Sequence, residues 1–271
     1  MDKNTTGKNT AGAQIVVSKP FLTGKAVDSS TLKSALMVFG SLFVVAIVYL
    51  IVCGVMNFDI VALRLVLNGL VVFATLAIYY SAGMSQGSIA VNNGEIMYHR
   101  RETGAKVSEE ELSRCYHPAK GFVSGLAGTL PFFLCALVLA LIAKRQVTGL
   151  GALPTWVSSL ETREEIGAPL AFYHEGVSLG LEGVLRIIVR LLIMPYVNMV
   201  GANNPDGLLI LERVSPLLIL LPGVFYGIGY TRGVQVRAKV HTDIARNTRK
   251  RAKKNQKAKK KSVQRGTIEL N

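Results

Sequence analysis

Residues 35–56 read ALMVFGSLFVVAIVYLIVCGVM, a run of 22 residues without a charged side chain. A helix of about 20 apolar residues is long enough to cross the hydrocarbon core of a bilayer. Half of the whole chain is hydrophobic and its mean hydropathy is +0.36, values that are unusual for a water-soluble domain. This stretch therefore predicts a membrane-spanning helix, and the composition predicts that it is one of several.

Three further apolar runs extend the pattern, at residues 60–83, 121–143 and 214–231. We expect each of them to cross the membrane as a helix. The spans 35–56 and 60–83 are predicted to form a tight helical hairpin, because only three residues separate them. The predicted fold class is all-α, an integral membrane bundle of four transmembrane helices.

A fifth segment, residues 177–200, is long enough to span but carries Glu182, Arg186 and Arg190. Spacings of four residues place these three charges along one face of a helix. One interpretation is an amphipathic or re-entrant helix at the membrane surface. The alternative is a fifth span whose polar stripe faces a path for an anionic substrate. Burying two arginines is costly, which favours the first interpretation.

The distribution of basic residues predicts the topology. Of the 31 Lys and Arg residues, 24 fall in segments 1–34, 84–120 and 232–271. Four spans place all three segments on one side, and cytoplasmic segments carry the excess of positive charge. We therefore predict a multi-pass protein of the cell membrane with both termini in the cytoplasm. The predicted division is a polar tail (1–34), a transmembrane region (35–233) with a cytoplasmic loop (84–120), and a basic tail (234–271).

The C-terminal stretch 246–265 reads RNTRKRAKKNQKAKKKSVQR and has no acidic or aromatic residue. A polybasic segment beside a span favours contact with anionic lipid headgroups. Without aromatic side chains, sequence-specific nucleic-acid binding is not expected, although ribosomal RNA phosphates could attract the same charges. We expect the stretch to be disordered, or to be an exposed helix that forms against the membrane. The predicted lipid contacts are Arg246, Arg249, Lys250, Arg251, Lys253, Lys254, Lys257, Lys259, Lys260, Lys261 and Arg265.

Two local patterns stand out in the 84–120 loop. Alternating apolar residues around Asn93-Gly94 predict a small β-hairpin. Residues 108–111 read SEEE and match a capping box, so a short helix is predicted to begin at Glu109 and to end at His117-Pro118.

Small residues four apart allow membrane helices to approach closely. This spacing predicts helix packing, within the chain or between copies of it, at Gly121, Gly125, Gly128, Gly223 and Gly227.

The sequence carries no nucleotide-binding loop, no GxGxxG motif after a strand and no GxSxG motif. Cys115 and His117 lack the further ligands that zinc requires. No enzymatic activity, cofactor or metal is therefore predicted. The preferred function is an accessory, scaffold or assembly component that binds lipid, with another membrane protein as a candidate partner. The alternatives are a small transporter that uses Glu182, Arg186 and Arg190, and a ribosome-coupled insertion factor.

Overall fold

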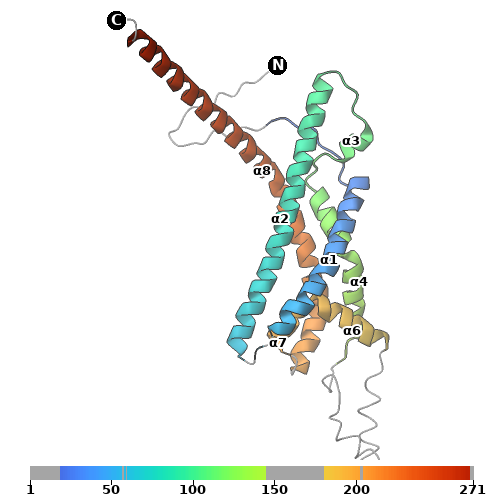
Figure 1. Ribbon diagram of the computed structural model, residues 1–271. Coiled ribbons are helices and arrows are strands. Elements are labelled where there is room, and N and C mark those ends of the chain that lie inside the picture. Colours follow the sequence, from blue (N-terminus) through green and yellow to red (C-terminus); the bar gives the residue numbers. More distant parts are fainter. Residues whose placement is uncertain (1–18, 57, 59, 145–179, 202–203, 269–271) are drawn as a thin grey trace, which may run out of the picture.

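The computed structural model describes residues 19–56, 58, 60–144, 180–201 and 204–268 (Figure 1). Within these residues the chain is helical and contains no β-strand, which confirms the all-α class. Four of the helices are long and apolar enough to cross a membrane, or five if α6 and α7 count as one broken span. The helices are α1 (Ser29–Val55), α2 (Val61–Glu102), α3 (Glu109–Ser113), α4 (Lys120–Ile142), α6 (Leu181–Leu192), α7 (Met194–Val200) and α8 (Pro205–Ile268).

The four long helices alternate in direction (Figure 1). At one end of the bundle, here called the terminal end, lie the start of α1, the last turns of α2, helix α3 and the start of α4. There the Ser30 hydroxyl donates to the carbonyl of Ser113. At the other, distal end, the Asn198 amide of α7 donates to the carbonyl of Cys53 in α1. Because α8 starts at the distal end, its C-terminal half emerges at the terminal end.

Helix α8 is the centre of the bundle and packs along both α2 and α4. Glycines permit this approach: a methyl group on Gly83 would lie 2.1 Å from the carbonyl oxygen of Tyr226, and one on Gly125 would lie 2.3 Å from that of Gly223. Backbones therefore meet directly, as small residues allow in membrane helices. The other glycines singled out from the sequence also lie at contacts: Gly121 against Tyr230, Gly128 against Val38, and Gly227 against Phe122.

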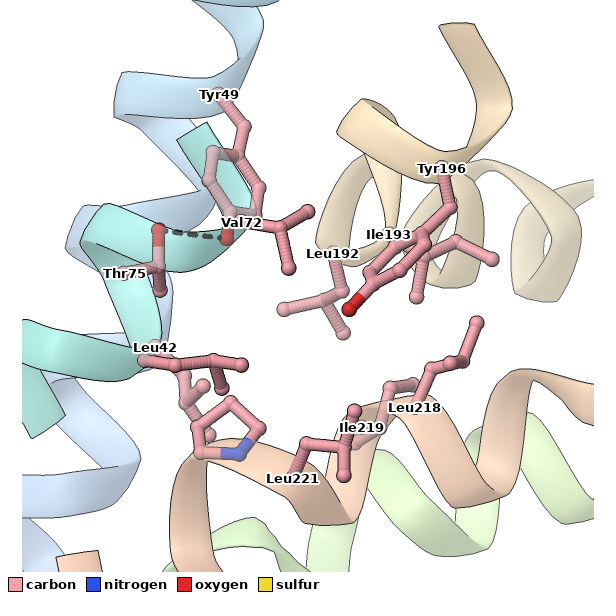
Figure 2. Close-up of a pocket in the computed structure, with 12 residues that line it drawn as sticks. Leu42, Tyr49, Val72, Thr75, Leu192, Ile193, Tyr196, Leu218, Ile219 and Leu221 are labelled. Atoms are coloured by element: carbon pink, nitrogen blue, oxygen red, sulfur yellow. Dashed lines mark hydrogen bonds between the residues drawn. The ribbon is translucent and has the colours of Figure 1, made fainter. Parts of the chain in front are cut away.

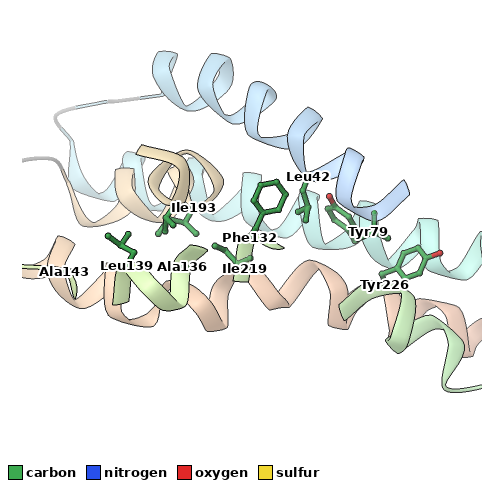
Figure 3. Packing of buried hydrophobic residues seen from close by; sticks show 11 residues of the cluster. Leu42, Tyr79, Phe132, Ala136, Leu139, Ala143, Ile193, Ile219 and Tyr226 are labelled. Atoms are coloured by element: carbon green, nitrogen blue, oxygen red, sulfur yellow. The ribbon is translucent and has the colours of Figure 1, made fainter. Parts of the chain in front are cut away.

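Most of the buried apolar side chains form one row along the bundle (Figure 3). Leu42 of α1, Phe132 of α4 and Ile219 of α8 meet in its middle. A second, smaller cluster contains Ala90, Val91, Tyr116 and Tyr230. Large apolar side chains also cover the outside, as with Leu36, which is 69% exposed. Such a surface is rare in water-soluble proteins and is expected where lipid surrounds the helices.

The prediction of a tight hairpin between the first two spans is wrong. Helix α1 packs on α4, where Gly128 approaches its backbone, and α2 packs on α8. Between α1 and α2 the described contacts are carried by long side chains. The Tyr49 hydroxyl donates to Thr75 Oγ1 at 2.9 Å, and Ser41 and Tyr79 share a hydrogen bond of 3.0 Å. In α2, Gly83 and Gly87 face α8. The contact of α2 with α1 is looser, and we call it the seam between α1 and α2.

The predicted β-hairpin at Asn93-Gly94 is also wrong, because α2 continues as a helix to Glu102. Gly94 serves a different purpose here. Its carbonyl accepts a hydrogen bond from the Leu22 backbone, and a methyl group on it would lie 2.6 Å from the Leu22 carbonyl oxygen. The glycine thus permits the close approach of the N-terminal segment instead of a turn.

The capping box that begins α3 is confirmed, with Ser108 and Glu111 bonded reciprocally. The helix ends at Ser113, earlier than the predicted His117. After the helix, the Tyr116 carbonyl accepts a hydrogen bond from the Gly24 backbone at 2.9 Å.

Candidate functional site

The charged segment of the sequence forms two short helices at the distal end. Helices α6 and α7 meet at 93° (Figure 1). Helix α6 packs against α4 and α1, and α7 packs against α2 and α1. Helix α4 ends at this face and α8 begins there. The described part of segment 177–200 is therefore either a re-entrant pair of helices or one broken span.

The structure brings Glu182, Arg186 and Arg190 together with a fourth charge, Glu212 of α8. Arg186 Nε and Arg190 Nε each donate to Glu212 Oε1 at 2.8 Å. Arg186 also pairs with Glu182 at 2.9 Å and donates to the Lys144 carbonyl at 2.9 Å. The side chains of Glu212 and Arg186 are 2% and 9% exposed.

This ion-pair cluster joins α6 to α8 and to the end of α4. Its two guanidinium groups face two carboxylates, so the positive charge of the stripe is balanced. Breaking a buried ion pair by removing one partner is strongly destabilising, because the other charge stays buried. The arrangement thus fits a structural clamp better than a site that attracts anions.

A second polar cluster joins α2 and α8 at the terminal end. Glu95 accepts from Arg237 Nε at 3.0 Å and shares a hydrogen bond of 2.7 Å with His241 Nε2. Arg237 also donates to the side-chain oxygen of Asn92. The side chains of Glu95 and His241 are 10% and 8% exposed. These contacts hold α8 against α2 for a further ten residues after its apolar run ends at residue 231.

Beyond His241, α8 leaves α2 obliquely and continues as a helix (Figure 1). We call residues 242–268 the basic arm. At 1.5 Å per residue its length is about 40 Å. All eleven predicted lipid contacts lie on it. The first six, Arg246, Arg249, Lys250, Arg251, Lys253 and Lys254, have exposed side chains, and the side chains of the other five lie outside the described residues.

The residues of the segment around α3 bond to one another, and the segment packs against α8. Cys115 is fully buried and its thiol, whose pKa is raised by burial, donates to the carbonyl of Glu111 at 3.6 Å. The Ser108 backbone N–H and the Arg100 guanidinium lower the pKa of the Glu111 carboxyl. Tyr116 stacks on Tyr230 with ring centroids 5.4 Å apart. No group of three or more potential metal ligands gathers in the described part of the chain.

A small cavity lies in the seam between α1 and α2, near the bend of α6 and α7 (Figure 2). Its volume is about 30 Å³ and its walls are mostly apolar, with Leu42, Ile193 and Ile219 among them. The Tyr49–Thr75 hydrogen bond lies at its edge. It has room for a water molecule and is far smaller than a typical ligand pocket.

Comparison with protein-family models, curated proteins and solved structures gave no match for this chain.

Proposed function

We propose that this protein is a non-enzymatic component of the cell membrane that holds a basic helical arm against anionic lipid headgroups at the cytoplasmic face. In this proposal the terminal end of the bundle faces the cytoplasm. The observation that carries it is the continuity of α8, a single helix from Pro205 to Ile268. The arm is thereby coupled to the transmembrane bundle. The contacts of Glu95 with Arg237 and His241 fix the direction in which it leaves the bundle.

The charge pattern of the arm supports an anionic partner. Eleven basic residues and no acidic residue occur between residues 246 and 265. Many of them are separated by four residues, as Arg246 and Lys250 are, so like charges repel along the helix. Each basic residue near an anionic surface contributes about 1 kcal/mol of binding free energy. A polyanionic surface therefore both binds the arm and stabilises it as a helix.

The transporter alternative has less support from the geometry. Arg186 and Arg190 are bonded to Glu212, so an incoming anion would have to compete with a buried carboxylate. The adjoining cavity is small and apolar. These features favour a scaffold whose charged stripe holds its own helices together.

The test uses the full chain in nanodiscs of neutral or anionic lipid. A dye on Asn247→Cys, in a background with the three native cysteines replaced by alanine, reports energy transfer to labelled headgroups. We expect stronger transfer in anionic nanodiscs and its loss at high salt, because salt screens exposed charges. Equal transfer in both lipids would overturn the proposal.

Two matched variants complete this experiment. Replacing the eleven basic residues by glutamine keeps helix propensity and should abolish the dependence on lipid charge. Replacing the lysines by arginine keeps the charge and should preserve it. Sedimentation with ribosomes that disappears on deletion of 246–265, combined with no response to lipid charge, would instead support the ribosome-coupled alternative.

A further inference from the structure

A larger cavity of about 390 Å³ lies at the terminal end, between α1, α2, α3 and α4 and next to α8. Most of the residues that line it are polar, and Lys33, Arg114 and Lys120 are its cationic groups. The acidic residue of the wall, Glu110, lies 3.5 Å from Arg114 and offsets only that charge. The cavity therefore carries net positive charge.

Lys120 is an unusual lining residue because it is only 5% exposed. Its ammonium group donates to the carbonyl of Ser113. Asp28, which caps α1, acts on it electrostatically, but Lys120 forms no ion pair with any residue that the structure describes. Buried charges are normally paired, since desolvating a lone charge is costly. The buried ammonium group thus leaves donors available for an anion.

Tyr230 supplies a second unused donor in the same wall. Its ring is fixed between Tyr116, on which it stacks, and Gly121. Its hydroxyl is buried and makes no hydrogen bond of good geometry within the described residues, although the backbone of His117 is near enough to interact with it. A buried donor without an acceptor is rare in folded proteins and indicates a missing partner.

The position of the cavity identifies the class of ligand. It lies where the polar residues before Ala35 meet those after Gly83, which is the level of the lipid headgroups. Its apolar residues, Met37 and Ile89, are 64% and 50% exposed. They continue into the seam between α1 and α2, which is not closed by direct helix packing.

We propose that this cavity binds the phosphate of an anionic membrane lipid, with Lys120 and Tyr230 as its buried donors. Lys33 and Arg114 attract the headgroup at the mouth. The acyl chains follow the apolar residues along the seam between α1 and α2. This site is separate from the basic arm and does not depend on it.

The test measures binding of short-chain phosphatidylglycerol by native mass spectrometry of the full chain. The protein carries glutamine at the eleven arm positions, so that the arm contributes no binding. We expect Tyr230→Phe to weaken binding about tenfold, since a hydrogen bond to a charged group is lost. Lys120→Met should weaken it at least as much. Unchanged affinity in both variants would overturn the proposal.

The matched control is Lys106→Gln, which removes one exposed charge at the same end but outside the cavity, and should leave affinity unchanged. Tyr230→Phe should also keep or raise the melting temperature in lipid-free detergent, because an unpaired buried hydroxyl is removed. A lower melting temperature would show that the hydroxyl already has a partner and would overturn its assignment.

Glycerophosphate added as a competitor separates a lipid from a soluble phosphate. For a lipid site, we expect it to compete only at concentrations far above those of phosphatidylglycerol, because it lacks the acyl chains. Displacement at equal concentration would assign the cavity to a soluble phosphate ester and overturn the lipid proposal.

Discussion

Glu212 shows how a single residue can change the functional interpretation of the charged stripe on α6. The spacing of Glu182, Arg186 and Arg190 could be read directly from the sequence, because it follows the helical period. Their acceptor could not, since Glu212 comes from another helix 22 residues after Arg190 and stands just before the apolar run 214–231. A signal was present: a stripe with one excess arginine at a membrane requires a carboxylate, and Glu212 follows the apolar residues LLIL and precedes Arg213.

We predict that Glu212→Gln destabilises the protein by about 3–5 kcal/mol, because two arginines lose their shared buried partner. The measurement is the melting temperature in detergent. Glu182→Gln is the matched control: its side chain is 35% exposed, so water can replace it and the loss should be much smaller. Equal losses in the two variants would contradict the central role of Glu212.

At the scale of helices, the close contacts of α8 follow from glycines on α8 itself and on its neighbours. The four-residue spacing identified Gly121, Gly125 and Gly223 as packing positions, but it could not identify the partner of each. Gly83 and Gly87 were missed because they lie at the polar end of an apolar run. The spacing of small residues identifies the face of a helix that can pack closely. It does not identify the helix that packs there, because that depends on the arrangement of the whole bundle.

We predict that Gly125→Ala destabilises the bundle by about 1–3 kcal/mol, because its methyl group would overlap the Gly223 carbonyl. Gly40→Ala makes the same change on an exposed face of α1, where nothing lies within 4 Å, and should stay within about 1 kcal/mol of the wild type. Thermal unfolding in one detergent compares the two. A larger loss for Gly40→Ala would contradict this account of packing.

Helix length was the property that local patterns predicted least well. Asn93-Gly94 is a common turn sequence, yet it lies inside α2 because neighbouring contacts outweigh local preference. The composition of the basic arm is compatible with disorder or with a helix, and α8 continues into it from the bundle. By contrast, the four apolar runs and the capping box at Ser108 were predicted correctly, since both depend on residues close in sequence.

For the whole molecule, the described helices place the start of α1, the end of α2 and the emergence of α8 at one end (Figure 1). The distal end holds Phe58, the end of α4 and the start of α8. This is the arrangement expected of four spans, with both termini on one side. The positive-inside rule assigns that side to the cytoplasm, which stays a prediction.

We predict that an impermeant thiol reagent labels Phe58→Cys, but not Asn247→Cys, in intact cells. Both positions are exposed in the structure, and the native cysteines are replaced by alanine to remove background labelling. Asn247→Cys should become reactive once the membrane is opened. Labelling of both positions in intact cells would contradict the proposed topology.

The central place of α8 has a consequence for biosynthesis. Among the described helices, α8 is synthesised last, and it provides the most extensive packing surface of α2. In a nascent chain that ends before Pro205, α1 can already pack on α4, whereas α2 still lacks its packing contact with α8. Close packing of α2 into the bundle therefore has to wait for the synthesis of α8.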